Sequence, residues 1–388
     1  MLMSSSSAQR IRSLDGLRGV AALVVLLGHI AVMVPTLSLA YDFAEMPSFG
    51  SPAWWVALTP LHILWAGPEA VQLFFVLSGI VLTLSARRAD FDWFAYYPRR
   101  IVRLYVPVCA AVLLAAASML LIPRSATGQS STWLSRRAAE YSPGSLRTDL
   151  SLLWGDTDFA LSPLWSLRWE VWFSLALPIF GAWAFLLIRW WPAKLALVAA
   201  TLAVGIATGW PELLYLPVFA VGSLVAVHWG SLQRLTERAL RRPYAGFLFL
   251  GATVILLTAR WWPIPLGLPW RASKWLSLAV LLGAVCAVLL AAHWDRANRV
   301  LTSAPLQWLG RVSFSLYLVH ETAILTVRHA WPDASMITVA LIAIPAALAT
   351  SWVFFLIVER PSMRLARKVG RSARETLSVE QPQEARPA

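Results

Sequence analysis

The sequence is poor in charged residues and in cysteine. Only 14% of its 388 residues are Asp, Glu, Lys or Arg, whereas soluble domains carry about 25%, so an ordinary soluble enzyme is excluded. The two cysteines, Cys109 and Cys286, form no disulfide framework and no metal-binding spacing. The apolar runs lack the period-two alternation of polar residues that a transmembrane β-barrel requires.

The chain has long apolar stretches instead. It is 58% hydrophobic and has a mean hydropathy of +0.63, and many runs approach the ~20 residues that span a bilayer as a helix. We therefore predict an all-α, polytopic integral membrane protein with about ten transmembrane helices. The predicted spans are residues 15–36, 66–84, 101–122, 169–188, 195–208, 212–228, 246–259, 274–292, 312–328 and 336–358.

The charge distribution predicts the orientation. We attribute the net charge of +13 to arginine in the cytoplasmic loops, because these loops are rich in Lys and Arg in membrane proteins. We do not attribute it to nucleic-acid binding. We expect both termini in the cytoplasm, the bilayer of the bacterial inner (cytoplasmic) membrane as partner, and no nucleic acid. Residues 1–360 form the predicted transmembrane domain, and residues 361–388 a basic, disordered cytoplasmic tail. The loop from Pro123 to about Arg168 is long enough to cover an outer cavity.

The segment RSLDGLRGVAALVVLLGHI (12–30) places a histidine inside an apolar run. Arg18 and His29 are eleven residues apart, which puts them on one helix face about 16 Å from each other, and Asp15 extends this stripe. Ionisable groups inside a membrane face protein or water, and a histidine in that position is a good general base. The alternatives are a structural histidine or a signal peptide with a cleavage site after Ala40.

The segment YYPRRIVRLYVP carries Arg99, Arg100 and Arg103 at a predicted helix start. Cations at a helix N-terminus oppose the helix dipole, so their presence indicates an anion. Forked guanidinium groups and free backbone N–H groups together suit phosphate. The alternative is that these arginines only anchor the helix at the cytoplasmic surface.

Two further segments carry a polar residue in an apolar span. In SPLWSLRWEVWF, Glu170 lies near the outer end of its helix; we hypothesise that it meets His29 and orients the imidazole ring. In AVQLFFVLSGIVLTL, Ser78 and Gly79 predict a close helix contact through small residues. Both predictions concern contacts between helices.

The segment LQWLGRVSFSLYLVHETAILTV (306–327) contains a second intramembrane histidine, His320. Ser313, Ser315 and Tyr317 lie close to it in the sequence. The histidine either lines the site or serves as a structural polar group between helices.

Together these stretches resemble one family, the acyltransferase 3 membrane proteins, which include O-acetyltransferases of bacterial surface polysaccharides, nodulation factors and macrolide antibiotics. The resemblance runs from Asp15 to Pro361, with two departures: Glu170–Val171 stands where the family often has two glutamates, and Phe173–Ser174 stands where the family has Phe-Tyr. The matching segments are LDGLRGVAALVVLLGH, FFVLSG, RRIVRLYVP, LWSLRWEVWF, VSFSLYLVH and VERP, in the family's order.

The resemblance implies a membrane O-acyltransferase. It would move an acyl group, most often acetyl, from cytoplasmic acyl-CoA to a hydroxyl of a glycan, glycolipid or macrolide-like natural product. His29 would be the general base supported by Glu170, and the resemblance implies no metal and no bound cofactor beyond the acyl-CoA co-substrate. The residues expected to bind acyl-CoA are Arg18, Arg100 and Arg103, and those expected to line the site are Asp15, Ser78, Trp165, Ser166, Tyr317 and His320.

Two other functions remain open from the sequence. One is a proton-coupled transporter or flippase of an anionic or glycan substrate, with His29 as the proton relay. The other is a membrane regulator that has kept the fold and lost the chemistry. Loss of acyl transfer in His29→Ala would separate the enzyme from both.

Overall fold

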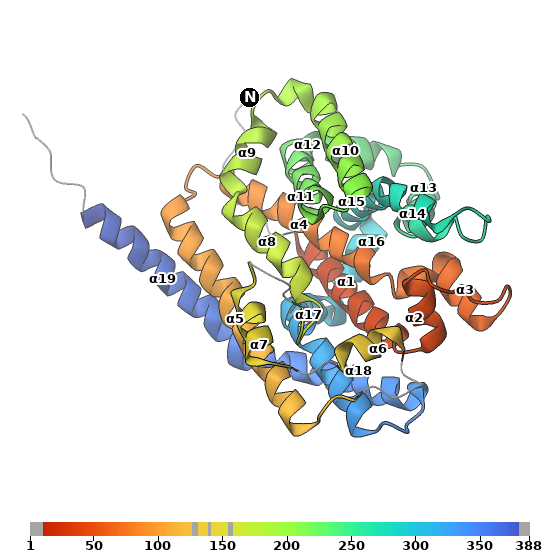
Figure 1. The fold of residues 1–388 in the computed structure, drawn as a ribbon. Coiled ribbons are helices and arrows are strands. Elements are labelled where there is room, and N and C mark those ends of the chain that lie inside the picture. The colour runs from red at the N-terminus through yellow and green to blue at the C-terminus, as the bar shows by residue number, and fades with distance from the viewer. Residues whose placement is uncertain (1–10, 126–130, 139–140, 154–157, 380–388) are drawn as a thin grey trace, which may run out of the picture.

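The computed structural model describes residues 11–125, 131–138, 141–153 and 158–379, and every regular element in these ranges is a helix (Figure 1). The predicted all-α class is confirmed. The helices of ten or more residues are α1 (Arg12–Ala31), α4 (Gly67–Ala86), α5 (Trp93–Leu121), α8 (Leu164–Leu175), α10 (Trp191–Thr208), α11 (Pro211–Val227), α12 (Trp229–Ala239), α13 (Ala245–Leu257), α15 (Ser277–His293), α17 (Ala304–Ala330), α18 (Met336–Phe354) and α19 (Arg360–Val379). The shorter elements are α2 (Pro35–Tyr41), α3 (Pro52–Leu58), η1 (Pro60–Leu64), α6 (Thr132–Arg137), α7 (Pro143–Ser151), α9 (Leu177–Phe185), η2 (Ile188–Trp190), η3 (Ala259–Trp261), α14 (Trp270–Trp275), α16 (Asp295–Leu301) and η4 (Phe355–Glu359).

Several helices are long and apolar enough to cross a membrane. In the described part of the chain there are five, or seven if the bent pairs α11 with α12 and α15 with α16 each form one span. This supports an integral membrane protein, but the predicted ten spans are not confirmed. The predicted span 246–259 corresponds to α13, whose 13 residues give only about 20 Å. The predicted span 169–188 is interrupted at Ala176, because Pro178 has no backbone N–H to continue the helix.

The helices α1 and α17 pack along each other in the middle of the molecule (Figure 1). Glycines allow this close approach: a Cβ atom on Gly19 would lie 2.6 Å from the backbone N of Gly310. Helices α4 and α11 meet in the same way, since a Cβ atom on Gly79 would lie 2.4 Å from the carbonyl oxygen of Phe219. The close contact predicted from Ser78 and Gly79 is therefore confirmed, and small residues are what such contacts inside a membrane require.

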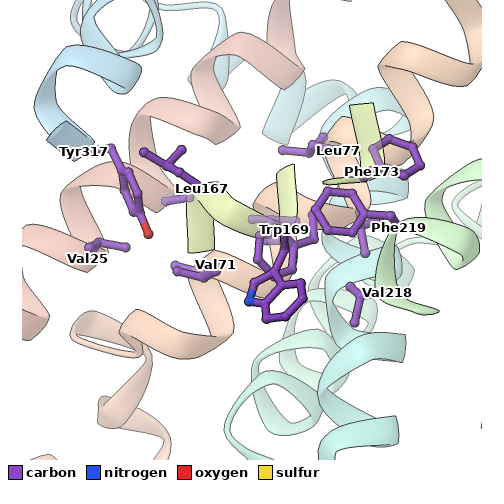
Figure 2. Close-up of a cluster of buried hydrophobic side chains, with 14 of the residues drawn as sticks. Val25, Val71, Leu77, Leu167, Trp169, Phe173, Val218, Phe219 and Tyr317 are labelled. Atoms are coloured by element: carbon purple, nitrogen blue, oxygen red, sulfur yellow. The ribbon is translucent and has the colours of Figure 1, made fainter. Parts of the chain in front are cut away.

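An aromatic cluster lies beside these crossings (Figure 2). The rings of Phe173 from α8 and Phe219 from α11 are fully buried and stacked, with centroids 4.6 Å apart. Phe75 of α4 stacks on Phe219 at 4.5 Å. Because lipid tails are as apolar as these side chains, the stabilisation comes from close packing more than from the hydrophobic effect. This cluster holds α8 in place and so fixes the position of Glu170, which α8 carries.

The end of the chain differs from the predicted disordered tail. Helix α19 covers Arg360–Val379 and packs against α5 (Figure 1). Its buried positions, Ser362, Ala366 and Gly370, repeat every four residues, and this spacing gives the helix one face that can pack. Residues 380–388, which belong to the same predicted tail, lie outside the described residues.

Short helices cover the end of α1 that carries His29. The Oγ of Ser38 in α2 lies 2.6 Å from the Oγ1 of Thr132 in α6, and Thr132 donates to Asp42 at 2.8 Å. These bonds place Trp133 of α6 over His29, with ring centroids 5.4 Å apart. Helix α6, which belongs to the described part of the predicted outer loop, therefore covers the polar site at His29, as expected for that loop. Residues 126–130, 139–140 and 154–157 of the loop lie outside the described residues.

Candidate active site

A cavity of about 640 Å³ lies where α1, α4, α5 and α17 converge. Five arginines and three acidic residues line it, and we call it the arginine cavity. The structure brings together here the three arginines that the sequence assigned to acyl-CoA: Arg18 from α1, and Arg100 and Arg103 from α5. Asp15 also lines this cavity. The excess of positive charge favours an anionic ligand.

Glu170 lies in the arginine cavity and pairs with Arg100. The Nη2 of Arg100 lies 2.5 Å from the Oε1 of Glu170, and the Nε of Arg100 donates to Ser174 at 2.9 Å. The Oγ of Ser78 donates to the same Oε1 at 3.3 Å. The hypothesis that Glu170 meets and orients His29 is therefore wrong in this geometry. Glu170 instead fixes the guanidinium of Arg100, since a carboxylate and a guanidinium form a directional, charge-assisted bond.

At the opposite end of α1, His29 and His320 are bonded to each other. The Nδ1 of His29 lies 3.0 Å from the Nε2 of His320 and 3.0 Å from the carbonyl oxygen of Val25. The Nδ1 of His320 lies 2.8 Å from the carbonyl oxygen of Leu316. A carbonyl only accepts, so both Nδ1 atoms carry protons. The Nε2 of His29 is then the nitrogen that remains to accept a proton.

A buried serine and a buried glutamate continue the hydrogen-bonded chain that starts at His29. The Nε2 of His29 lies 3.0 Å from the Oγ of Ser162. That hydroxyl lies 2.5 Å from the Oε2 of Glu321, which also accepts the backbone N–H of Ser162 at 2.7 Å. Glu321 is completely buried. The three side chains form a hydrogen-bonded chain that can hold a proton at either end, as an imidazolium with a carboxylate or as an imidazole with a carboxylic acid.

Two arginines balance the charge of Glu321. The Nε of Arg137 in α6 lies 3.5 Å from the Oε1 of Glu321. Arg124 lies just beyond the end of α5, and burial lowers its pKa to about 10, while Glu321 opposes that shift. Both Nη atoms of Arg124 are buried without a hydrogen-bond partner in the part of the chain that the structure describes. A buried carboxylate needs such neighbours to stay ionised.

A small pocket lies between the arginine cavity and the histidines. It has a volume of about 30 Å³, and its lining includes Arg18, Glu170, Ser166 and Tyr317. The Oγ of Ser166 and the phenol oxygen of Tyr317 are 2.6 Å apart, and the ring of Tyr317 lies 6.2 Å from that of His320. Polar groups therefore continue from the arginine cavity towards His29 through the interior of the bundle.

The structure separates the predicted site residues into groups. Arg18, Asp15, Arg100, Arg103 and Glu170 line the arginine cavity. Ser166 and Tyr317 line the small pocket, and His320 contacts His29. Ser78 bonds Glu170. Trp165 belongs to none of these groups, because its ring packs against Tyr215, at 4.9 Å, and Phe75 in the aromatic cluster.

Sequence reasoning missed three residues at the histidine end: Ser162, Glu321 and Arg137. One signal was present, because Glu321 directly follows His320 inside an apolar run, and an intramembrane carboxylate marks a functional site. Ser162 and Arg137 carry no comparable signal, since serine and arginine are common in loops. No group of three or more His, Cys, Asp or Glu side chains that could hold a metal ion occurs among the described residues.

Comparisons with known proteins identify the family of this chain. The chain is 28% identical to "Acyltransferase MdmB" of Streptomyces mycarofaciens over an alignment of 392 positions that covers 92% of this chain and 92% of that protein. No solved structure matches. A family model described as an acyltransferase domain matches residues 11–356, which include both histidines, the arginines of the cavity and Glu321. The chain belongs to the acyltransferase 3 family and is an acyl-transferring enzyme.

Proposed function

We propose that the protein is an inner-membrane O-acyltransferase that moves an acyl group, most often acetyl, from cytoplasmic acyl-CoA to a hydroxyl of a glycan, glycolipid or macrolide-like acceptor. The observation that carries the proposal is the position of His29. Its Nε2 can accept a proton once the hydroxyl of Ser162 turns away from it, while its Nδ1 is held by a carbonyl and by His320. A ring fixed in this tautomer is suited to general-base catalysis.

The donor would bind at the arginine cavity, on the cytoplasmic side. Its volume of about 640 Å³ falls within the range of small-molecule sites, roughly 300–1,000 Å³. Arg18, Arg100 and Arg103 offer guanidinium groups to phosphate oxygens, which they match geometrically. Glu170 holds Arg100 in place for this role. The pantetheine arm would then extend towards His29, and donor binding has to widen the small pocket between them.

The chemical step needs one base and one acid. The Nε2 of His29 takes the proton of the acceptor hydroxyl as its oxygen attacks the thioester carbonyl carbon. The tetrahedral intermediate collapses with cleavage of the C–S bond, and the same proton passes from Nε2 to the departing thiolate. The products are the ester and CoA–SH. For the acceptor to reach Nε2, the hydroxyl of Ser162 turns away from the ring while keeping its bond to Glu321.

Glu321 would stabilise the imidazolium that forms during this step. Its carboxylate is buried and is linked to the ring of His29 through one hydroxyl. In such a water-poor site a negative charge acts strongly on a nearby positive one. Arg137 stabilises the ionised carboxylate while the imidazolium exists.

The test uses the purified protein in lipid nanodiscs with ¹⁴C-acetyl-CoA and a pool of glycan, glycolipid and macrolide acceptors. Wild type is compared with His29→Gln, which keeps a polar side chain of similar size. We expect acceptor labelling by wild type and a loss of about 10²- to 10⁴-fold in the variant. His329→Gln is the matched control, because His329 lies in the last turn of α17, its Nδ1 lies 2.8 Å from the carbonyl oxygen of Leu325, and it lines neither the arginine cavity nor the small pocket.

Two results would contradict the proposal. Full activity of His29→Gln would remove His29 as the base. No transfer by wild type from acetyl-CoA or from longer acyl-CoA donors would remove acyl-CoA as the donor.

A further inference from the structure

A second cavity, of about 630 Å³, lies between α5 and α19. We call it the α5–α19 cavity. One wall comes from the end of α4, from α5 and from the turn between them. The other wall comes from α19, which begins beyond residue 356, where the family match ends. The proposed transfer reaction uses none of the α19 side chains. The α19 wall of this cavity therefore has no assigned role.

The cavity is strongly basic. Seven arginines and two aspartates line it. Each aspartate already has a partner: Asp90 pairs with Arg88 at 2.9 Å, and Asp92 lies 3.7 Å from Arg374. The remaining arginines at the α19 wall, Arg367 and Arg371, have no acidic partner within 4.0 Å among the described residues. A net positive cavity with exposed guanidinium groups attracts a multiply charged anion.

The two cavities are adjacent. Ser85, Arg88, Arg100, Arg103 and Met363 line both the arginine cavity and the α5–α19 cavity. Only these shared side chains therefore lie between a ligand in the arginine cavity and the α5–α19 cavity. The arginines at the shared boundary would contact the middle of such a ligand.

One face of α19 lines this cavity. Its lining residues Met363, Arg367, Gly370, Arg371 and Arg374 recur at spacings of three and four and so share one face of the helix. Gly370 leaves room for the side chain of Arg99, since a Cβ atom there would lie 2.2 Å from both Cγ and Cδ of Arg99. The side chain of Arg99 therefore packs directly against α19 at Gly370. The cavity wall also includes Phe91 and Tyr96, which offer flat apolar surface.

We propose that the α5–α19 cavity binds the nucleotide end of the acyl-CoA donor, which is 3′,5′-ADP, with Arg99, Arg367 and Arg371 on its phosphates. The proposal rests on the proposed function, in which acyl-CoA is the donor. A phosphomonoester carries about −1.5 to −2 charges at neutral pH, and guanidinium forks match its oxygens. The adenine would lie against Phe91, which is partly buried at the wall. Anionic lipid headgroups share the phosphate chemistry and are the competing occupant.

The experiment compares two donors that differ only in the 3′,5′-ADP group. Acetyl-CoA carries the nucleotide, and acetyl-4′-phosphopantetheine lacks it. In the double variant Arg367→Gln/Arg371→Gln we expect KM for acetyl-CoA to rise roughly 10- to 100-fold, with KM for acetyl-4′-phosphopantetheine unchanged. Both arginines are exposed, so their replacement leaves the packing of α19 intact. The matched control is Arg364→Gln/Lys368→Gln, which removes two charges from the same helix at positions that do not line the cavity.

A binding measurement separates this proposal from the proposed function. Calorimetric titration of 3′,5′-ADP into the full-length protein in nanodiscs needs no turnover, and we expect binding by wild type that the double variant loses. Equal KM values in wild type and variant, or an equal rise for both donors, would overturn the proposal. Wild type that binds 3′,5′-ADP but transfers nothing would overturn only the transfer reaction. An effect of the double variant that appears in phosphatidylglycerol nanodiscs and vanishes in phosphatidylcholine nanodiscs would assign the cavity to lipid headgroups instead.

Discussion

The Nε2 of His29 lies 3.0 Å from the Oγ of Ser162, although 133 positions separate the two residues in the sequence. That hydroxyl also contacts the buried Glu321 at 2.5 Å. A single hydroxyl thus stands between the candidate base and the carboxylate that can stabilise its protonated form. Each member of this chain should have a distinguishable effect on catalysis.

Ser162→Ala should lower kcat for acetyl transfer by about 10- to 100-fold, because the hydrogen bonds from Ser162 to the charged groups are lost. KM for acetyl-CoA should stay the same, since Ser162 does not line the arginine cavity. Steady-state kinetics in nanodiscs with ¹⁴C-acetyl-CoA provides both values. A loss as complete as that of His29→Gln, together with ¹⁴C retained on wild-type protein after denaturation, would show instead that Ser162 itself carries the acyl group.

Glu321→Gln and Glu170→Gln form a matched pair, because both replace a carboxylate with an amide of the same size. Glu321→Gln should reduce kcat by at least about 100-fold with KM for the donor unchanged, since Glu321 acts at the histidines. Glu170→Gln should mainly raise KM for acetyl-CoA, because it loosens Arg100 in the arginine cavity. Measured kcat and KM of the two variants decide the assignment. The opposite pattern would restore Glu170 as the partner of the base.

Trp133→Phe should increase hydrolysis of acetyl-CoA relative to transfer. The indole of Trp133 is 9% exposed and covers His29, so a smaller ring admits water to the activated thioester. Phenylalanine keeps the position apolar and preserves the fold. Comparing ¹⁴C-acetate release with ¹⁴C-labelled acceptor in the same reaction gives the ratio. An unchanged ratio would mean that Trp133 does not exclude water from the base.

Gly79→Leu should destabilise the folded protein by about 1–3 kcal/mol, since a side chain there meets the backbone of α11. Gly251→Leu is the control, because no atom lies within 4 Å of a Cβ built at Gly251. The fraction of each variant that stays monodisperse on size-exclusion chromatography after heating measures the difference. Equal heat resistance of the two variants would show that α4 and α11 separate readily at this crossing.

Local patterns in the sequence led to correct conclusions where they concern one helix. Arg18 and His29 lie on the single helix α1, as their spacing predicts, and the small residues at Ser78 and Gly79 mark a real helix contact. The number of spans was less predictable, because hydropathy alone does not show that Pro178 restarts the helix after Ala176. The predicted disordered tail differs because its residues 361–379 find a packing partner in α5, which composition does not reveal.

The sequence by itself determined the membrane class, the family and the helix that joins Arg18 to His29, since apolar length and helical spacing are local properties. Only the tertiary structure decided which carboxylate serves which group. Glu170 and Glu321 are both glutamates in apolar segments, and nothing local distinguishes them. The packing of α8 against α5 turns Glu170 towards Arg100, whereas α17 places Glu321 against Ser162. Contacts between helices depend on crossing positions set by glycines and aromatic rings far apart in the chain, and those positions exist only once the helices have packed.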